Sequence, residues 1–175
     1  MFLPVSNISF STVNGPGNRL VIWVQGCRLN CKGCFNPETH SYDGGRNVDI
    51  DQIVSELNSN CLIDGITISG GEPLDYTIEL KALLKLLRPS LTSIIYTGYT
   101  INEIREDSNK LSLIHSADLV LSGRYRRKLH HPYLGKKILN ISGRIDPNYF
   151  LPKTRIEYSI AQDKVTKTGI FKTQL

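Results

Sequence analysis

The sequence has 175 residues, of which 40% are hydrophobic and 21% charged, with a formal net charge of +5. This length fits one domain that folds without disulfide staples, and the composition excludes a disordered, collagen-like or low-complexity chain. The longest uninterrupted apolar run, Leu20–Val24, is far shorter than the ~20 residues that span a membrane. Met1–Val5 is too short and uncharged for a signal peptide, so we expect a soluble cytoplasmic protein with a single domain over residues 1–175.

Four short runs of β-forming residues are predicted to be strands, and each ends at a glycine-containing turn. In chain order they are Leu20–Val24, Gly65–Ser69, Ser93–Tyr96 and Leu119–Leu121. The C-terminal part has a different pattern: Arg155–Ala161 and Val165–Ile170 alternate in polarity around Gln162, Asp163 and Lys164, which predicts an antiparallel β-hairpin.

Amphipathic helices are predicted between the strands. The first begins with a capping-box-like pattern at Asp49 and Gln52, and its apolar residues have the spacing of one helix face: Ile50, Ile53, Val54 and Leu57. The second has its apolar face at Leu80, Leu83, Leu84 and Leu87 and ends before Pro89. The third begins at Thr100, with Glu103 completing its capping box.

Strands that alternate with helices predict a parallel α/β sheet. Ligands of such sheets bind at the carboxyl ends of the strands. Each chemically distinctive segment follows a predicted strand: the cysteines the first, Gly-Gly-Glu the second, Thr-Gly-Tyr the third and Ser-Gly the fourth. We therefore expect these four segments to meet at one edge of the sheet.

Three of the four cysteines lie within eight residues, with the spacing C-x3-C-x2-C: Cys27, Cys31 and Cys34. Without a secretory signal, such a cluster indicates metal or redox chemistry rather than a disulfide framework. Three thiolates in one tight loop can hold three corners of a [4Fe–4S] cube. The fourth iron would then be open to a small molecule, as the fourth position of a catalytic zinc site is.

Two other interpretations of the cysteine loop remain open. A zinc site could take Cys61 or His40 as a fourth ligand, and Cys31 and Cys34 could form a redox C-x-x-C pair that leaves Cys27 unexplained. Cys61 otherwise fits a small apolar residue near a helix end, and His40 fits a loop residue.

The sequence resembles the radical SAM superfamily. The C-x3-C-x2-C loop after the first strand and Ser69-Gly70-Gly71-Glu72-Pro73 after the second match its two signatures in order. At subfamily level it is similar to the activating proteins of anaerobic ribonucleotide reductase, in Val13–Arg19, Cys34-Phe35-Asn36 and Thr97-Gly98-Tyr99. The resemblance covers about residues 8–141 and implies a partial, open (β/α) barrel, with residues 142–175 as a C-terminal extension.

This resemblance implies that Cys27, Cys31 and Cys34 hold a [4Fe–4S] cluster whose open iron binds S-adenosylmethionine. One electron from the cluster would cleave the sulfonium to give a 5′-deoxyadenosyl radical that abstracts a hydrogen atom. The implied cofactor-binding residues follow the strands or the cysteines: Gly33, Phe35, Gly70, Gly71, Glu72, Thr97 and Ser122. Glu72 would orient the glycine loop, or it would cap the helix that follows.

The implied partner is a large protein, a glycyl radical enzyme that brings its own loop to the open side of the barrel. A flavodoxin-like or ferredoxin-like protein would supply the electron. The alternative is a radical SAM enzyme that modifies a peptide or a small metabolite. It stays open because the chain has Ser122-Gly123-Arg124-Tyr125 where the activating proteins tend to have Asp-Gly and an aromatic residue.

Positive charge is concentrated in one segment, Leu119–Ile145, which has no Asp or Glu. Its seven basic residues are Arg124, Arg126, Arg127, Lys128, Lys136, Lys137 and Arg144. The segment is either a solvated surface loop or a docking site for an acidic partner, protein or nucleic acid. We expect no nucleic-acid partner, because the sequence has no recognisable RNA-binding motif.

Overall fold

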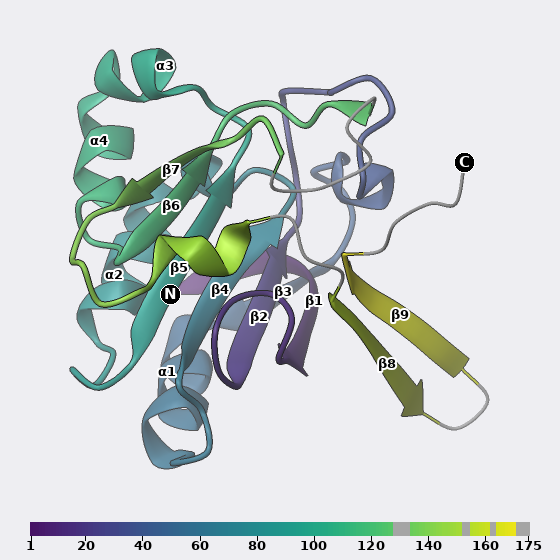
Figure 1. Cartoon of the computed structure of the whole chain (residues 1–175), viewed down its shortest axis with the longest axis vertical. Helices are drawn as coiled ribbons and strands as arrows, with labels where there is room; N and C mark the ends of the chain where they lie inside the picture. The colour runs from purple at the N-terminus through teal and green to yellow at the C-terminus, as the bar shows by residue number, and fades with distance from the viewer. Residues whose placement is uncertain (128–133, 152–154, 162–163, 171–175) are drawn as a thin grey trace.

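The computed structural model describes residues 1–127, 134–151, 155–161 and 164–170. Its centre is a seven-stranded sheet with the order β3-β1-β2-β4-β5-β6-β7 (Figure 1). The four inner strands run parallel: β2 (Arg19–Val24), β4 (Gly65–Gly70), β5 (Thr92–Thr97) and β6 (Leu119–Ser122). They correspond to the four predicted strands, so the predicted α/β class with parallel strands is confirmed. The order ends at β3 and β7, which leaves the sheet open.

Three antiparallel strands that the sequence did not predict flank this centre: β1 (Phe2–Ser11), β3 (Arg46–Asp49) and β7 (Lys137–Asn140). In β1, the buried Leu3 and Val5 alternate with less buried residues, but a bulge between Val5 and Asn7 interrupts the pattern. The strands β3 and β7 are short, with four residues each, as edge strands often are. These three strands therefore form because their backbones pair with a neighbouring strand, and not because their side chains alternate in polarity.

Helices cover one face of the sheet (Figure 1): α1 (Ile50–Ser59), α2 (Thr77–Lys85), α3 (Ile101–Arg105) and α4 (Ser108–Ile114). Their apolar residues pack against Ile66, Ile68 and Ile95 of the sheet. The predicted capping box of Thr100 and Glu103 is present at the start of α3. The sequence did not predict α4 as a separate helix, which begins where the Asp107 carboxylate accepts hydrogen bonds from the amides of Asn109 and Lys110.

The other face of the sheet is covered in part by residues that follow β7. Ile145 and Phe150, the latter in the 3-10 helix η4 (Pro147–Phe150), pack against Ile94, Tyr96 and their neighbours on β6. Arg144 binds the Asp118 carboxylate with its Nε at 2.8 Å. Residues 142–150, which were predicted from the sequence as part of the extension, thus pack on the sheet beside Tyr96, which also lines the cavity described below.

The predicted hairpin is present as β8 (Arg155–Ala161) and β9 (Lys164–Ile170), which pair antiparallel in a sheet of their own (Figure 1). Gln162 and Asp163 of its turn, like Lys128 of the basic segment, lie outside the described residues. The Glu157 carboxylate of β8 accepts hydrogen bonds of 3.2 Å from the amide and hydroxyl of Thr12. Within the described ranges, no helix has the length and apolar character needed to cross a membrane.

Candidate active site

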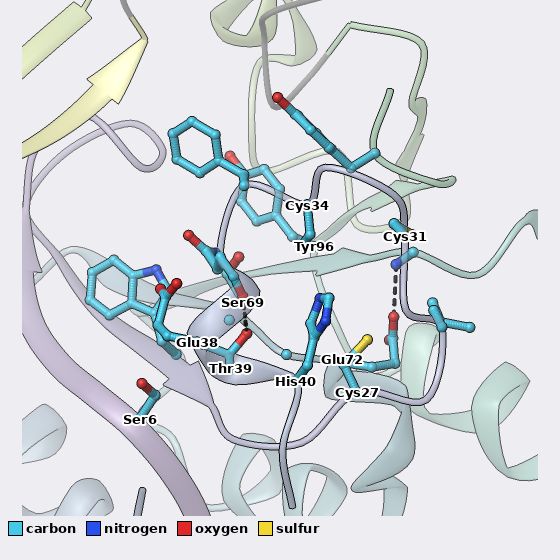
Figure 2. Close-up of a pocket in the computed structure, with 18 of the residues that line it drawn as sticks. Ser6, Cys27, Cys31, Cys34, Glu38, Thr39, His40, Ser69, Glu72 and Tyr96 are labelled. Atoms are coloured by element: carbon cyan, nitrogen blue, oxygen red, sulfur yellow. Dashed lines mark hydrogen bonds between the residues drawn. The ribbon is translucent and has the colours of Figure 1, made fainter. Parts of the chain in front are cut away.

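The loops that follow the parallel strands surround one cavity of about 440 Å³ (Figure 2). Val24 pairs with Gly70, and Thr97 with Ser122, so the inner strands end at nearly the same level. The cavity is lined by residues from successive loops, among them Cys27, Cys31, Cys34, Phe35, Gly70, Gly71, Glu72, Thr97 and Tyr125. The predicted meeting of these segments at one edge of the sheet is therefore confirmed.

The cysteine loop is anchored at both of its sides by main-chain hydrogen bonds. Where it leaves β2, the amides of Gly26 and Cys27 donate to the carbonyls of Thr39 and His40 at 2.9 and 3.0 Å. Within the loop, the Cys34 amide donates to the Cys31 carbonyl at 3.1 Å, which closes a tight turn between these cysteines. These hydrogen bonds therefore hold all three thiols at one cavity, although residues 27–34 form neither a helix nor a strand.

The three thiols are half-buried and unbonded to one another. Burial raises the pKa of Cys27 and of Cys34 above the usual thiol value. A thiol must lose its proton to bind iron, so loading a cluster into this cavity releases protons. Among the described residues, no three His, Cys, Asp or Glu side chains are arranged to hold a single metal ion. Three thiols in one cavity fit a [4Fe–4S] cube, in which each thiolate binds a different iron.

The two other candidate zinc ligands differ in position. Cys61 is exposed and precedes β4, so it lies beyond the opposite edge of the sheet. His40 lines the cavity, and its Nε2 is buried with no hydrogen-bond partner among the described residues (Figure 2). Buried polar atoms are normally hydrogen-bonded, so this nitrogen indicates a polar occupant. The donor set and this nitrogen both fit an inorganic cluster with a polar small molecule beside it.

Gly70 and Gly71 bring the turn after β4 directly against the start of the cysteine loop. Gly70 has a φ of +98°, and a Cβ on it would lie 2.5 Å from the Val24 nitrogen. A Cβ on Gly71 would lie 2.1 Å from the Gly26 carbonyl oxygen. No real Cβ tolerates such contacts, so the two glycines are required by the contact between the loops themselves, before any ligand is considered.

The Glu72 carboxylate is buried beneath the cavity and joins the second loop to the third. Its Oε1 accepts hydrogen bonds from the Leu74 amide at 2.9 Å and the Thr97 hydroxyl at 2.7 Å. Its Oε2 accepts from the Gly98 amide at 2.8 Å. Glu72 therefore caps η2 (Pro73–Asp75), one of the two roles considered for it from the sequence, and it also fixes the end of β5. Burial raises the pKa of Glu72 to about 7.

A Glu72→Gln variant should be less stable, by about 1–3 kcal/mol, because the amide must point an N–H at one of three donors. The difference in the free energy of unfolding between wild type and variant should be larger at about pH 5 than at about pH 8. Between these two pH values the folded wild type keeps a proton on Glu72, whereas the unfolded chain, in which this carboxyl has its lower ordinary pKa, releases it. Rising pH therefore lowers the free energy of unfolding of the wild type, and this effect is missing from the variant. Urea unfolding of both proteins at the two pH values measures this difference, and a pH-independent gap would contradict it.

The remaining predicted site residues divide into two groups. Phe35 and Thr97 line the cavity, but the Thr97 hydroxyl already donates to Glu72 and accepts from the Tyr99 amide at 3.0 Å. Gly33 and Ser122 are not among the lining residues. The Ser122 hydroxyl donates to the Tyr99 carbonyl at 2.8 Å, and Gly33, with a φ of +68°, lies under the Arg127 side chain.

Tyr125 and Lys136 are among the lining residues that were not predicted from the sequence as site residues. Tyr125 packs on Phe35 with a ring-centroid distance of 6.1 Å. Lys136 donates from Nζ to the carbonyls of Thr97, at 2.8 Å, and Gly123, and burial lowers its pKa to about 8. From the sequence, Lys136 was interpreted only as one of the basic residues of Leu119–Ile145. Nothing in its local sequence indicates burial, because its place depends on how β7 returns beside β6.

The chain is similar to a known domain family and to several known proteins. Residues 13–140 match the model of the 4Fe-4S single cluster domain. The anaerobic ribonucleoside-triphosphate reductase-activating protein of Vibrio cholerae is 31% identical over 132 residues, which is 70% of this chain and 83% of that protein. A putative glycyl-radical enzyme activating enzyme of Haemophilus influenzae is 39% identical over 92 residues, half of this chain and 35% of that protein. QueE from Escherichia coli superposes with a TM-score of 0.46 at 16% identity, over 57% of this chain and 54% of QueE.

The fold and the cysteine loop define the class: the chain belongs to the 4Fe-4S single cluster domain family of radical SAM enzymes. Within that class it belongs to the family of the anaerobic ribonucleoside-triphosphate reductase-activating proteins, the glycyl-radical-enzyme-activating type. The match to an iron–sulfur family favours the cluster over the zinc and C-x-x-C interpretations.

Proposed function

We propose that this chain cleaves S-adenosylmethionine reductively and uses the product radical to form a glycyl radical on an anaerobic ribonucleoside-triphosphate reductase. The observation that carries the proposal is that the three thiols of the cysteine loop and the Gly70–Glu72 turn line the same cavity. The relatives support the choice of partner, since the Vibrio cholerae protein is named for activating such a reductase.

In this proposal Cys27, Cys31 and Cys34 each bind one iron of a [4Fe–4S] cluster, which supplies one electron at low potential to the bound sulfonium. The Gly70–Gly71 turn would accept hydrogen bonds from the ligand's ammonium group, and Glu72, which follows this turn, is fixed by its own three hydrogen bonds. Lys136 adds positive charge to the wall of the cavity near the negative thiolates. The protein thus positions the reacting groups and excludes water, while the cofactor performs the bond cleavage.

Other predicted residues take less direct roles. Phe35, held by Tyr125, offers an aromatic surface for the adenine, and Gly33 keeps the cysteine loop tight. Thr97 and Ser122 fix the turns at the ends of β5 and β6 through their hydroxyl hydrogen bonds. We also propose that residues 1–175 act as a single domain, because residues 142–150 cover part of the second face of the sheet.

The electron comes, in this proposal, from a flavodoxin-like or ferredoxin-like protein. A thiolate-bound cluster requires thiols that stay reduced, which supports a cytoplasmic location. The open side of the seven-stranded sheet leaves room for a loop of a large protein substrate.

The test uses anaerobically reconstituted protein, dithionite, S-adenosylmethionine and a purified anaerobic ribonucleoside-triphosphate reductase. We expect 5′-deoxyadenosine together with a glycyl-radical EPR signal on the reductase. If 5′-deoxyadenosine forms but the reductase gains no radical, the substrate is a peptide or small metabolite and the choice of partner is wrong. If no 5′-deoxyadenosine forms from iron-loaded protein, the proposed chemistry fails.

A further inference from the structure

The basic segment is not the continuous charged surface that its sequence indicates. Arg124 is paired with Glu103, Nη2 to Oε1 at 2.6 Å, and Arg144 is paired with Asp118. Lys136 is turned inward to the cavity wall. Arg126 and Arg127, in contrast, are exposed. Only part of the segment is therefore available to a partner.

Arg126 and Arg127 line a groove of about 600 Å³ that the cysteine loop also lines. We call this the basic groove; its described lining residues are Leu29, Cys31, Lys32, Arg124, Tyr125, Arg126 and Arg127. Four of these seven are cationic and none is acidic. The Arg127 side chain crosses the cysteine loop at Gly33, where a Cβ would lie 2.7 Å from the Arg127 Cδ.

Cys31 is the important member of the groove, because it also lines the main cavity. A cluster held by Cys31 would have this thiolate as a direct covalent path to the groove. Electron transfer needs only such proximity, whereas hydrogen abstraction needs the substrate inside the main cavity. The two openings share only Leu29, Cys31 and Tyr125 among their described residues, so an electron donor and a protein substrate can use different walls.

We propose that the basic groove is the docking surface for a small acidic one-electron carrier protein. This rests on the proposed function, since it assumes a cluster on Cys31. One docking event transfers one electron: the carrier is oxidised by one electron and the cluster is reduced by one, which matches the single electron used per sulfonium cleaved. Complementary charge steers the acidic carrier to the groove and orients its redox centre toward Cys31. Nucleic acid is disfavoured because Tyr125, the one aromatic ring among the described lining residues of the groove, is packed on Phe35.

The test is the variant Arg126→Glu with reduced flavodoxin as the probe. This side chain is exposed; Lys32 is left unchanged because it lies between Cys31 and Cys34, and Arg127 because it packs on Gly33. The control is Arg105→Glu, which makes the same charge change on an exposed residue of α3. The readouts are the flavodoxin dissociation constant at low and high salt, the RNA affinity, and the formation of 5′-deoxyadenosine and of the glycyl radical, driven by flavodoxin or by dithionite.

We expect the groove variant to bind flavodoxin at least about tenfold more weakly at low salt, with the difference shrinking at high salt. Its flavodoxin-driven activity should fall in parallel, while its dithionite-driven activity stays at the wild-type level. The control variant should match the wild type in every readout.

Three results would overturn the docking site: unchanged flavodoxin affinity, an equal loss in the control variant, or a loss confined to radical transfer to the reductase with dithionite. The last would assign the groove to the protein substrate, and a selective loss of RNA affinity would assign it to nucleic acid. If wild-type protein with dithionite makes no 5′-deoxyadenosine, the proposed function fails, whatever the groove binds.

Discussion

A Cys31→Ala variant should lose the visible absorption of the iron–sulfur cluster and the production of 5′-deoxyadenosine together. Changing only the surroundings of a metal ligand weakens binding about 10–100-fold, so removing one of three ligands should cost more than about a hundredfold. Cys27 and Cys34 line the same cavity, and two thiolates would leave two irons without protein ligands. The measurements are iron and sulfide content, the absorption spectrum and product formation after anaerobic reconstitution.

Cys61→Ala is the matched control for this variant. Cys61 is exposed and lies at the far edge of the sheet, so its removal should leave iron content and activity unchanged. The assignment of ligands would be wrong if Cys31→Ala kept a full cluster. It would also be wrong if the wild-type protein held zinc in place of iron, or if Cys61→Ala lost iron to the same extent.

An Arg19→Met variant should be the most destabilised of the single substitutions outside the site, by about 3–5 kcal/mol. The Arg19 guanidinium is fully buried and donates five hydrogen bonds to oxygens of four residues. Its Nε binds the Thr67 hydroxyl at 2.7 Å, and its Nη2 binds the Ile66 carbonyl at 2.6 Å. Burial lowers its pKa to about 10, and methionine would remove the donor from every one of these acceptors.

Arg19 joins three parts of the chain at the amino-terminal edge of the sheet. Its Nη1 donates to the Pro16 carbonyl at 3.1 Å and to the Thr92 hydroxyl at 2.9 Å, so it links the turn before β2 to the start of β5. Gly65 lies so close that a Cβ on it would be 2.7 Å from the Arg19 Nη1. The segment Val13–Arg19, on which the family resemblance partly rests, therefore contains this buried cation and part of its enclosure.

Urea unfolding measures the effect of Arg19→Met against Lys85→Met, an exposed lysine on α2 whose loss should change stability by less than about 0.5 kcal/mol. Arg19→Lys should fall between them, because an ammonium cannot reach all the acceptors of a guanidinium fork. The S-adenosylmethionine affinity of the protein that remains folded should be unchanged, since Arg19 and the cysteine loop lie at opposite ends of β2. Equal stability of Arg19→Met and wild type would contradict this account.

Local sequence patterns were sufficient for the elements whose burial shows in the sequence itself. The runs in β2, β5 and β6 have apolar residues on both faces; the helices cover one face, and residues 142–150 cover the other face of β5 and β6. Such runs are recognisable without knowledge of their neighbours. Since parallel strands place their carboxyl ends together, the meeting of the cysteine loop with the Gly70–Glu72 turn also followed from the sequence.

The sequence alone therefore determined the parallel α/β centre, the edge of the sheet that holds the site, and the three thiols at that edge. Only the tertiary structure decided that Arg19 and Lys136 are buried, that Gly70 and Gly71 serve loop-to-loop contact, and that the basic segment divides among ion pairs, cavity wall and groove. The physical reason is the range of the interactions. Periodicity and capping depend on neighbours within a few residues, whereas a buried cation or a Cβ clash depends on atoms contributed by segments far away in the chain.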